Sequence, residues 1–206
     1  MNSRLAKVVS VVFHPLLLPS YLFSLILYYL PPEVLSFPAE GKKYVLFLIF
    51  MTTFLFPSMA TYAMRRAGYV SSMELDERTD RRWPLLFAAS CYTVVTVLFY
   101  RQPYFNSLFF YVMGIITASV YLTLVVNQFW KISAHAVGIG GILGILVLLN
   151  SWLPEPYLLF PIIAAIAITG TVLSARLALN AHTPHQVYAG FGLGFLLGVS
   201  LWGLAL

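Results

Sequence analysis

Residues that could do chemistry fall in three short segments of an otherwise apolar chain. They are ELDERTDRRWP at 74–84, WKISAHAVG at 130–138 and SARLALNAHTPHQ at 174–186. Between them, these segments hold arginine, lysine, serine and histidine side chains. Arginine binds phosphate through paired hydrogen bonds, and histidine can attack phosphorus or supply a proton near neutral pH. We therefore interpret the three segments as parts of one anion-binding site with two working imidazoles.

The second and third segments carry two regular spacings, Ser-x-His at Ser133 and His135 and Arg-x5-His at Arg176 and His182. Phosphoryl transfer needs a nucleophile, positive charge around the phosphate oxygens and a proton for the leaving oxygen. Because Ser133 and His135 stand where an apolar helix begins, backbone N–H groups would also face the anion. Glu155 is the only acid in the later half of the chain. We therefore predict no metal and no other cofactor.

The order of a basic Arg/Pro segment, Ser-x-His and Arg-x5-His resembles the type 2 phosphatidic acid phosphatase family, which is related to vanadium haloperoxidases. Members of that family are metal-independent helical membrane phosphatases that act on lipid phosphates. The resemblance implies that His182 is the nucleophile and His135 the general acid. It also implies a phosphate-binding set, which comprises Arg176, Ser133 and one or more of Arg78, Arg81 and Arg82.

The chain departs from the family pattern in ways that bear on turnover. Gln186 stands where the family has an aspartate that accepts the N–H of the nucleophilic imidazole and stabilises its positive form. The amide oxygen of Gln186 can accept the same bond but adds no charge. Ala175 replaces the serine before the arginine, and the first segment lacks the family spacing Lys-x6-Arg-Pro. Three outcomes stay open: slow turnover, a charge supplied by Asp76 or Asp80, or a site that binds without cleaving.

Other polar residues near the segments have simpler interpretations. Lys131, beside Trp130, either contacts the phosphate or anchors the chain at the membrane interface. His185 lies next to the motif and is interpreted as a neighbour at a helix start. His14 precedes Pro15 in the first apolar run, where we expect it to bond a backbone carbonyl at a kink, with a role in the site as the alternative.

The rest of the chain must build a membrane bundle that positions these segments. Of its 206 residues, 60% are hydrophobic and 9% charged, whereas a soluble domain carries about 25% charged residues. A spanning helix needs about 20 apolar residues, and long runs that do not alternate exclude a β-barrel. We predict an all-α integral membrane protein, a single domain over residues 1–206 with six to seven transmembrane helices. The apolar runs cover 8–30, 44–64, 83–100, 108–126, 133–150, 157–174 and 185–206.

If every run spans, the connections 65–82, 127–132 and 175–184 share one membrane face, because two crossings separate each from the next. The first run, interrupted by His14-Pro15 and Pro19, is expected to be kinked or re-entrant. An excess of lysine and arginine on the shared face favours the cytoplasmic side. Several of these cations are ligand candidates, so the membrane side stays open.

Glycines mark two of the apolar runs, in GIGGILG at 138–144 and GFGLGFLLG at 190–198. Small residues four apart let membrane helices approach closely. We predict that these two helices pack tightly and thereby hold His135 near His182.

The predicted function is that of a membrane hydrolase of phospholipid metabolism, cleaving a lipid phosphate or pyrophosphate through a phosphohistidine. The expected location is a bacterial inner (cytoplasmic) membrane, with a lipid phosphate and membrane lipids as partners, no nucleic acid, and an open oligomeric state. The alternative is a degenerate relative that binds or moves lipid phosphates. A third possibility is a magnesium-dependent prenyl transferase, since Asp76-x3-Asp80 resembles one diphosphate-binding motif, although the second acidic cluster of such enzymes is missing.

Overall fold

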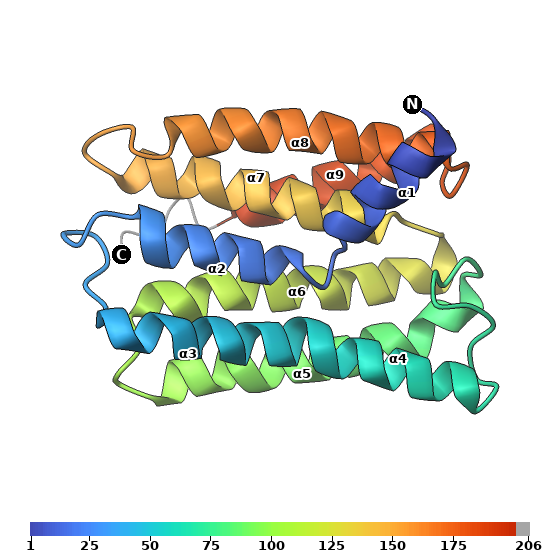
Figure 1. Cartoon of the computed structure of the whole chain (residues 1–206), viewed down its shortest axis with the longest axis horizontal. Coiled ribbons are helices and arrows are strands. Elements are labelled where there is room, and N and C mark those ends of the chain that lie inside the picture. The colour runs from blue at the N-terminus through green and yellow to red at the C-terminus, as the bar shows by residue number, and fades with distance from the viewer. Residues whose placement is uncertain (201–206) are drawn as a thin grey trace. The chain divides into compact units, whose positions relative to one another are not determined.

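The computed structural model describes residues 1–200, and every regular element in that range is helical (Figure 1). A π-helical turn at Met51–Leu55 joins α3 to α4, and a 3₁₀ turn at Thr79–Arg81 leads into α5. The helices are α1 (Ser3–Val12), α2 (Leu18–Tyr29), α3 (Ala39–Phe50), α4 (Phe56–Arg66), α5 (Arg82–Arg101), α6 (Ser107–Phe129), α7 (Ala134–Trp152), α8 (Leu159–Ala178) and α9 (Pro184–Gly198).

Five helical segments are long and apolar enough to cross a membrane. They are Ala39–Arg66, Thr79–Arg101, Ser107–Phe129, Ala134–Trp152 and Leu159–Ala178. The predicted all-α class is confirmed for the described residues, and by length and composition the chain is a multi-pass membrane protein. These five helices alone do not reach the expected count of six to seven. The last predicted run extends to residue 206, and its residues 201–206 lie outside the described part.

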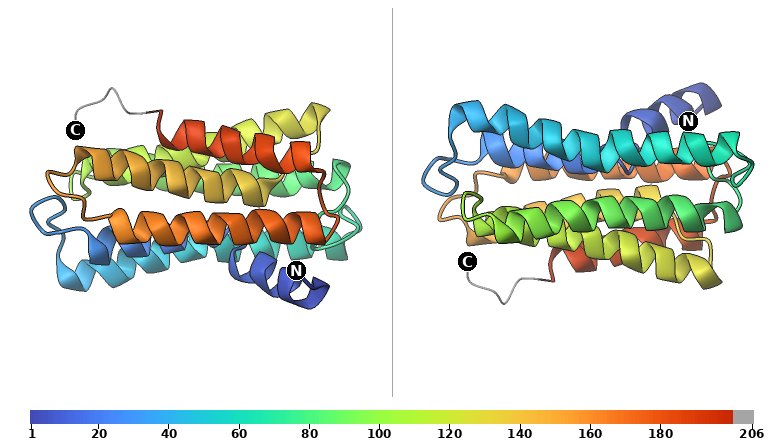
Figure 2. Two further views of the ribbon diagram at one scale, coloured as in Figure 1. Left: turned by 90° about the horizontal axis from the view of Figure 1, so that it is seen from above. Right: turned by 90° about the horizontal axis from the view of Figure 1, so that it is seen from below.

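The chain divides into two compact units. The first combines Met1–Leu18 with Ile132–Leu206, and the second is Pro19–Lys131. Within the first unit α7 packs along α9 and α8, and α1 packs on α8; within the second, α5 packs along α6 (Figure 2). The expectation of a single domain stays a prediction.

The first apolar run is broken into two helices by His14 and Pro15. The N–H of His14 turns back to the carbonyl of Val11 at 3.3 Å, which tightens and ends α1. Pro15 has no N–H and disfavours helical geometry at the residue before it. The predicted interruption is therefore real, and it separates α1, of 10 residues, from α2, of 12 residues.

A proline also shapes the helix from α3 to α4. Pro57 lacks the N–H that would bond the carbonyl of Thr53 four residues earlier. The hydroxyl of Tyr92, a buried residue of α5, donates to that carbonyl at 3.2 Å. The π-helical turn and this donor let the chain pass the proline as one apolar segment.

Glycines bring α7 and α9 into backbone contact. A Cβ at Gly194 would collide with the carbonyl of Val137, and one at Gly144 would lie 2.5 Å from the carbonyl of Phe195. Any larger side chain at these positions would force the helices apart. The predicted close packing of this helix pair is confirmed.

Candidate functional site

Five of the predicted site residues belong to the first unit, where they occupy neighbouring helix ends. Ser133 and His135 lie at the start of α7, Arg176 in the last turn of α8, and His182 and Gln186 just before and within the first turn of α9. The remaining candidates belong to the second unit, and their membership of the site stays a prediction. They are Arg78, Arg81, Arg82 and Lys131.

The end of α8 sets the relation between Arg176 and His182. Asn180 adopts a left-handed backbone conformation with φ of 51°, which terminates the helix. The N–H of Asn180 donates to the carbonyl of Leu177 at 3.0 Å, and the N–H of Ala181 donates to that of Arg176 at 3.3 Å. These two bonds form the Schellman arrangement of a helix C-terminus. The Arg-x5-His spacing thus corresponds to a capped helix end, with Arg176 in the last turn of α8 and His182 just after the cap.

The bond between His182 and Gln186 fixes which nitrogen of the imidazole carries the proton. Gln186 Oε1 accepts the backbone N–H of Thr183 at 3.2 Å, as expected of a glutamine at the third position of a helix. Because an N–H can only donate, the atom facing Thr183 is the amide oxygen. The same oxygen lies 3.1 Å from Nδ1 of His182, which must therefore be the protonated nitrogen. In the neutral ring the lone pair is then on Nε2, and the residue is 7% exposed.

Ser133 joins the starts of α7 and α9. Its N–H donates to the carbonyl of Gln186 at 3.3 Å, and its hydroxyl caps α7 by accepting the N–H of Ala136 at 3.4 Å. A Cβ at Gly190 would lie 2.9 Å from the carbonyl of Ser133, so this glycine permits the approach. Capping alone would explain a serine here. However, a hydroxyl that accepts one bond still has a hydrogen to donate to an anion.

Ser10 of α1 is a neighbour of the predicted site residues that the sequence did not identify. Its carbonyl lies 3.0 Å from Nε2 of His135, and its hydroxyl accepts a hydrogen bond from Nη1 of Arg176 at 3.2 Å. A carbonyl can only accept, so Nε2 of His135 carries a proton. Ser10 therefore contacts two of the predicted functional side chains at once.

His14, for which the sequence left a site role open, lies against one of the predicted site residues. Its ring meets that of His135 edge to face, with centroids 5.6 Å apart. Nδ1 of His14 accepts the N–H of Leu16 at 3.3 Å, whereas the sequence predicts a bond from this ring to a carbonyl. His14 lies outside the five helices that are long and apolar enough to span a membrane, and burial, followed by the charge of Arg176, lowers its pKa from 6.5 to about 4. This imidazole is therefore neutral at physiological pH.

In the second unit, Arg78 and Arg81 hold backbone. Nη1 of Arg78 donates to the carbonyls of Asn127, at 3.2 Å, and Gln128, which end α6. A cation is favourable at a helix C-terminus. Nε of Arg81 donates at 2.8 Å to the carbonyl of Leu75, a residue in the left-handed conformation with φ of 53°. Both arginines therefore have a structural role in the loop before α5.

The other polar residues of that loop differ in their exposure and partners. The guanidinium of Arg82 lies over the ring of Trp83, 5.3 Å from its centroid, and both side chains are exposed. Lys131 is half-buried at the end of the second unit. Asp80 accepts the N–H and the hydroxyl of Ser71 at 2.8 and 2.5 Å. This acid, a candidate to replace the missing family carboxylate, is thus bonded within its own loop.

The family resemblance rests on the motif residues alone, because comparison with known proteins found no match. No family model matches the chain, and no curated protein or solved structure matches it. Within residues 1–200, no group of three histidine, cysteine, aspartate or glutamate side chains could hold a metal ion.

Proposed function

We propose that this chain is a membrane phosphatase that hydrolyses a lipid phosphate or pyrophosphate through a phosphohistidine intermediate, as the resemblance to type 2 phosphatidic acid phosphatases implies. The observation that carries the proposal is the His182–Gln186 bond of 3.1 Å. It holds a buried imidazole in the tautomer whose lone pair is on Nε2, on the turn that also carries Arg176. An imidazole held by one nitrogen and reactive at the other is the usual arrangement of a working histidine.

The first chemical step is an attack on phosphorus. Nε2 of His182 forms a bond to phosphorus as the bond from phosphorus to the lipid or phosphate oxygen breaks, and the leaving oxygen takes a proton from His135. Nδ1–H of His182 stays bonded to Gln186 while the ring becomes positive. Arg176 balances the charge of the equatorial phosphate oxygens, and the hydroxyl of Ser133 donates to one of them.

Water completes the cycle. His135, now neutral, removes a proton from a water molecule as the water oxygen attacks phosphorus. The P–N bond breaks, phosphate leaves, and His182 returns to its neutral form. One lipid phosphate and one water therefore give one alcohol and one phosphate, or two phosphates from a pyrophosphate bond, with no redox partner.

The finer membrane topology is part of the same proposal. Besides the five long helices, α2 and α9 are apolar helices of 12 and 15 residues, and they are the candidates for further crossings that would give six to seven. We also propose that the protein resides in a bacterial inner membrane, that its lipid substrate reaches the site from the bilayer, and that Lys131 and one or more of Arg78, Arg81 and Arg82 add charge to the site.

A phosphate-release screen tests this function. Purified protein in detergent with EDTA present is given phosphatidic acid, phosphatidylglycerophosphate or a polyprenyl pyrophosphate. We expect release from at least one substrate, abolished by His182→Ala and retained by His185→Ala, which alters an exposed histidine on the same turn. Absence of release from every substrate, or equal activity of the two variants, would contradict the proposal.

Gln186 favours one alternative function. A phosphohistidine ring is positive, and an amide in place of a carboxylate gives that charge no counter-ion. A protein that binds or moves lipid phosphates without hydrolysis needs only the neutral imidazole and the cations. It would show saturable, salt-sensitive binding of phosphatidic acid, with no turnover that depends on His182.

A further inference from the structure

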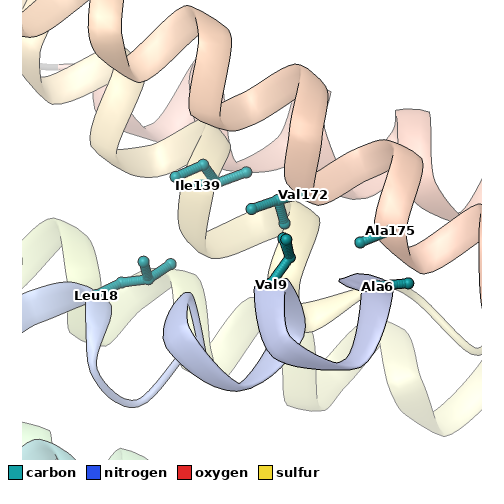
Figure 3. Close-up of a cluster of buried hydrophobic side chains, with 6 residues drawn as sticks. All are labelled: Ala6, Val9, Leu18, Ile139, Val172 and Ala175. Carbon is teal, nitrogen blue, oxygen red and sulfur yellow. The ribbon is translucent and has the colours of Figure 1, made fainter. Parts of the chain in front are cut away.

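The amino-terminal helix α1 is packed so that its last turns face the candidate site. Ala6 and Val9 are buried against Val172 and Ala175 of α8 (Figure 3). Ser10 follows Val9 on the inward side of α1 and is 8% exposed. Apolar packing thus sets the place of the hydroxyl and the carbonyl of Ser10 relative to the last turn of α8.

The break after α1 explains why the carbonyl of Ser10 can accept a bond from another helix. In a continuous helix this carbonyl would accept the N–H of His14, four residues later. Here the N–H of His14 donates to Val11 instead. The carbonyl of Ser10 therefore meets Nε2 of His135 at 3.0 Å, and the rings of His14 and His135 meet in a T-shaped arrangement.

The hydroxyl of Ser10 is also used in an unusual way for a serine within a helix. Such hydroxyls commonly donate to the carbonyl four residues back, as Ser24 does to Ser20 at 2.7 Å. The hydroxyl of Ser10 instead accepts from Nη1 of Arg176 at 3.2 Å. A planar guanidinium that is anchored at one nitrogen presents its remaining N–H groups in a fixed direction.

We propose that Ser10 is a positioning residue of the phosphate site, orienting Arg176 through its hydroxyl and His135 through its carbonyl. The inference rests on the proposed phosphatase activity. Its chemical consequence concerns the general acid: Nε2–H of His135 stays bonded to Ser10, so the proton given to the leaving oxygen comes from Nδ1. After that transfer His135 is neutral with its proton on Nε2, the tautomer that the carbonyl stabilises.

A pair of isosteric variants tests the role of the hydroxyl. Ser10→Thr and Ser10→Val add the same bulk at a buried position and leave the backbone carbonyl in place, but only threonine keeps an acceptor for Arg176. We expect Ser10→Val to lower kcat/KM for the lipid phosphate about tenfold or more below Ser10→Thr, the loss typical of a hydrogen bond to a charged group. In an Arg176→Met background, which has no donor for the hydroxyl, the two variants should have equal residual kcat/KM.

The outcomes separate this inference from the function on which it rests. Wild-type protein that releases no phosphate overturns the proposed function and this inference together. Wild-type turnover with equal kcat/KM for Ser10→Thr and Ser10→Val overturns the positioning role alone. The positioning role is also overturned if the difference between them persists unchanged with Arg176→Met, because the hydroxyl then acts through another group. A thermal melt of both variants in detergent checks that they carry the same packing cost.

Discussion

Gln186→Glu is the substitution that tests the proposed chemistry most directly. The change keeps the side-chain length, so the carboxylate can still accept the N–H of Thr183, and a glutamate suits this capping position as well as glutamine does. A negative charge in the first turn of α9 also interacts favourably with the helix dipole. We therefore expect the fold to be retained while Nδ1 of His182, 3.1 Å from Oε1, gains an anionic partner.

The expected gain can be worked from that geometry. In the transition state His182 becomes positive, and two unit charges about 4 Å apart interact by about 4 kcal/mol at an effective dielectric constant of about 20. Since about 1.4 kcal/mol of barrier corresponds to a factor of ten in rate, the ceiling is a rise in kcat of roughly 10³-fold. Gln186 is half-buried, so solvent screening reduces this to about 10²-fold. The value is below the ~10⁴-fold effect of the reverse replacement in a serine protease triad.

The assay is phosphate release at a saturating lipid phosphate, with a matched third variant. Gln186→Met keeps the length but loses the acceptor, so kcat should fall about 10- to 100-fold below wild type. The value of kcat should therefore rise from methionine to glutamine to glutamate at position 186. The double variant Gln186→Glu, His182→Ala should be inactive. A folded Gln186→Glu protein with kcat at or below wild type would show that His182 does not become positive in the transition state. If wild type only binds its lipid, the same substitution should create turnover.

Packing at Gly194 and Tyr92 and the ionisation of His14 can each be tested by substitution. Gly194→Ala should destabilise the protein by about 1–3 kcal/mol and reduce activity, because the new Cβ meets the α7 backbone. The control Gly192→Ala, which has open space around it, should be neutral or stabilising by up to about 1 kcal/mol. Tyr92→Phe should cost about 1–3 kcal/mol by leaving a buried carbonyl without its donor, and the exposed Tyr100→Phe less than about 0.5 kcal/mol, both measured by thermal unfolding. The pKa of His14 is about 6.5 in the unfolded chain and about 4 in the folded protein. As pH falls below 6.5, the unfolded chain takes up a proton that the folded protein does not, so the free energy of unfolding decreases. In His14→Phe, the free energy of unfolding should depend less on pH between pH 6.5 and 4 than it does in wild type. An unchanged pH dependence would contradict the lowered pKa of His14.

Features that depend on neighbouring residues were predictable from the sequence. The relation between Arg176 and His182 is produced by one capped turn, in which Asn180 supplies the left-handed residue that asparagine tolerates. The bond between Gln186 and His182 was expected from two residues four apart on one helix. It forms instead because Gln186, at the third position of α9, reaches back past the N-cap Thr183 to His182. The break at His14 followed from a proline that cannot donate. In each case the determining residues lie within one or two helical turns.

The contribution of α1 could not be predicted in the same way. Ser10 bonds to residues 125 and 166 positions away, and it does so because Ala6 and Val9 find their packing partners on α8. A serine within an apolar helix carries no local signal of such a contact. Only the helix break at His14, which frees the carbonyl of Ser10, was visible in the sequence. Which group donates to that carbonyl depends on the packing of α1, which places His135 next to it.

The arginines before α5 show why residue type alone does not assign a phosphate ligand. A phosphate oxygen and a backbone carbonyl are both acceptors, and a guanidinium satisfies either with the same N–H groups. Arg78 bonds to the end of α6, and Arg81 to the left-handed residue Leu75. Arg82 instead lies exposed over Trp83, and no spacing in the sequence distinguishes it from the other two. Of these three arginines, Arg82 is therefore the one whose guanidinium is not bonded to backbone in the described residues, and which of them binds phosphate stays a prediction.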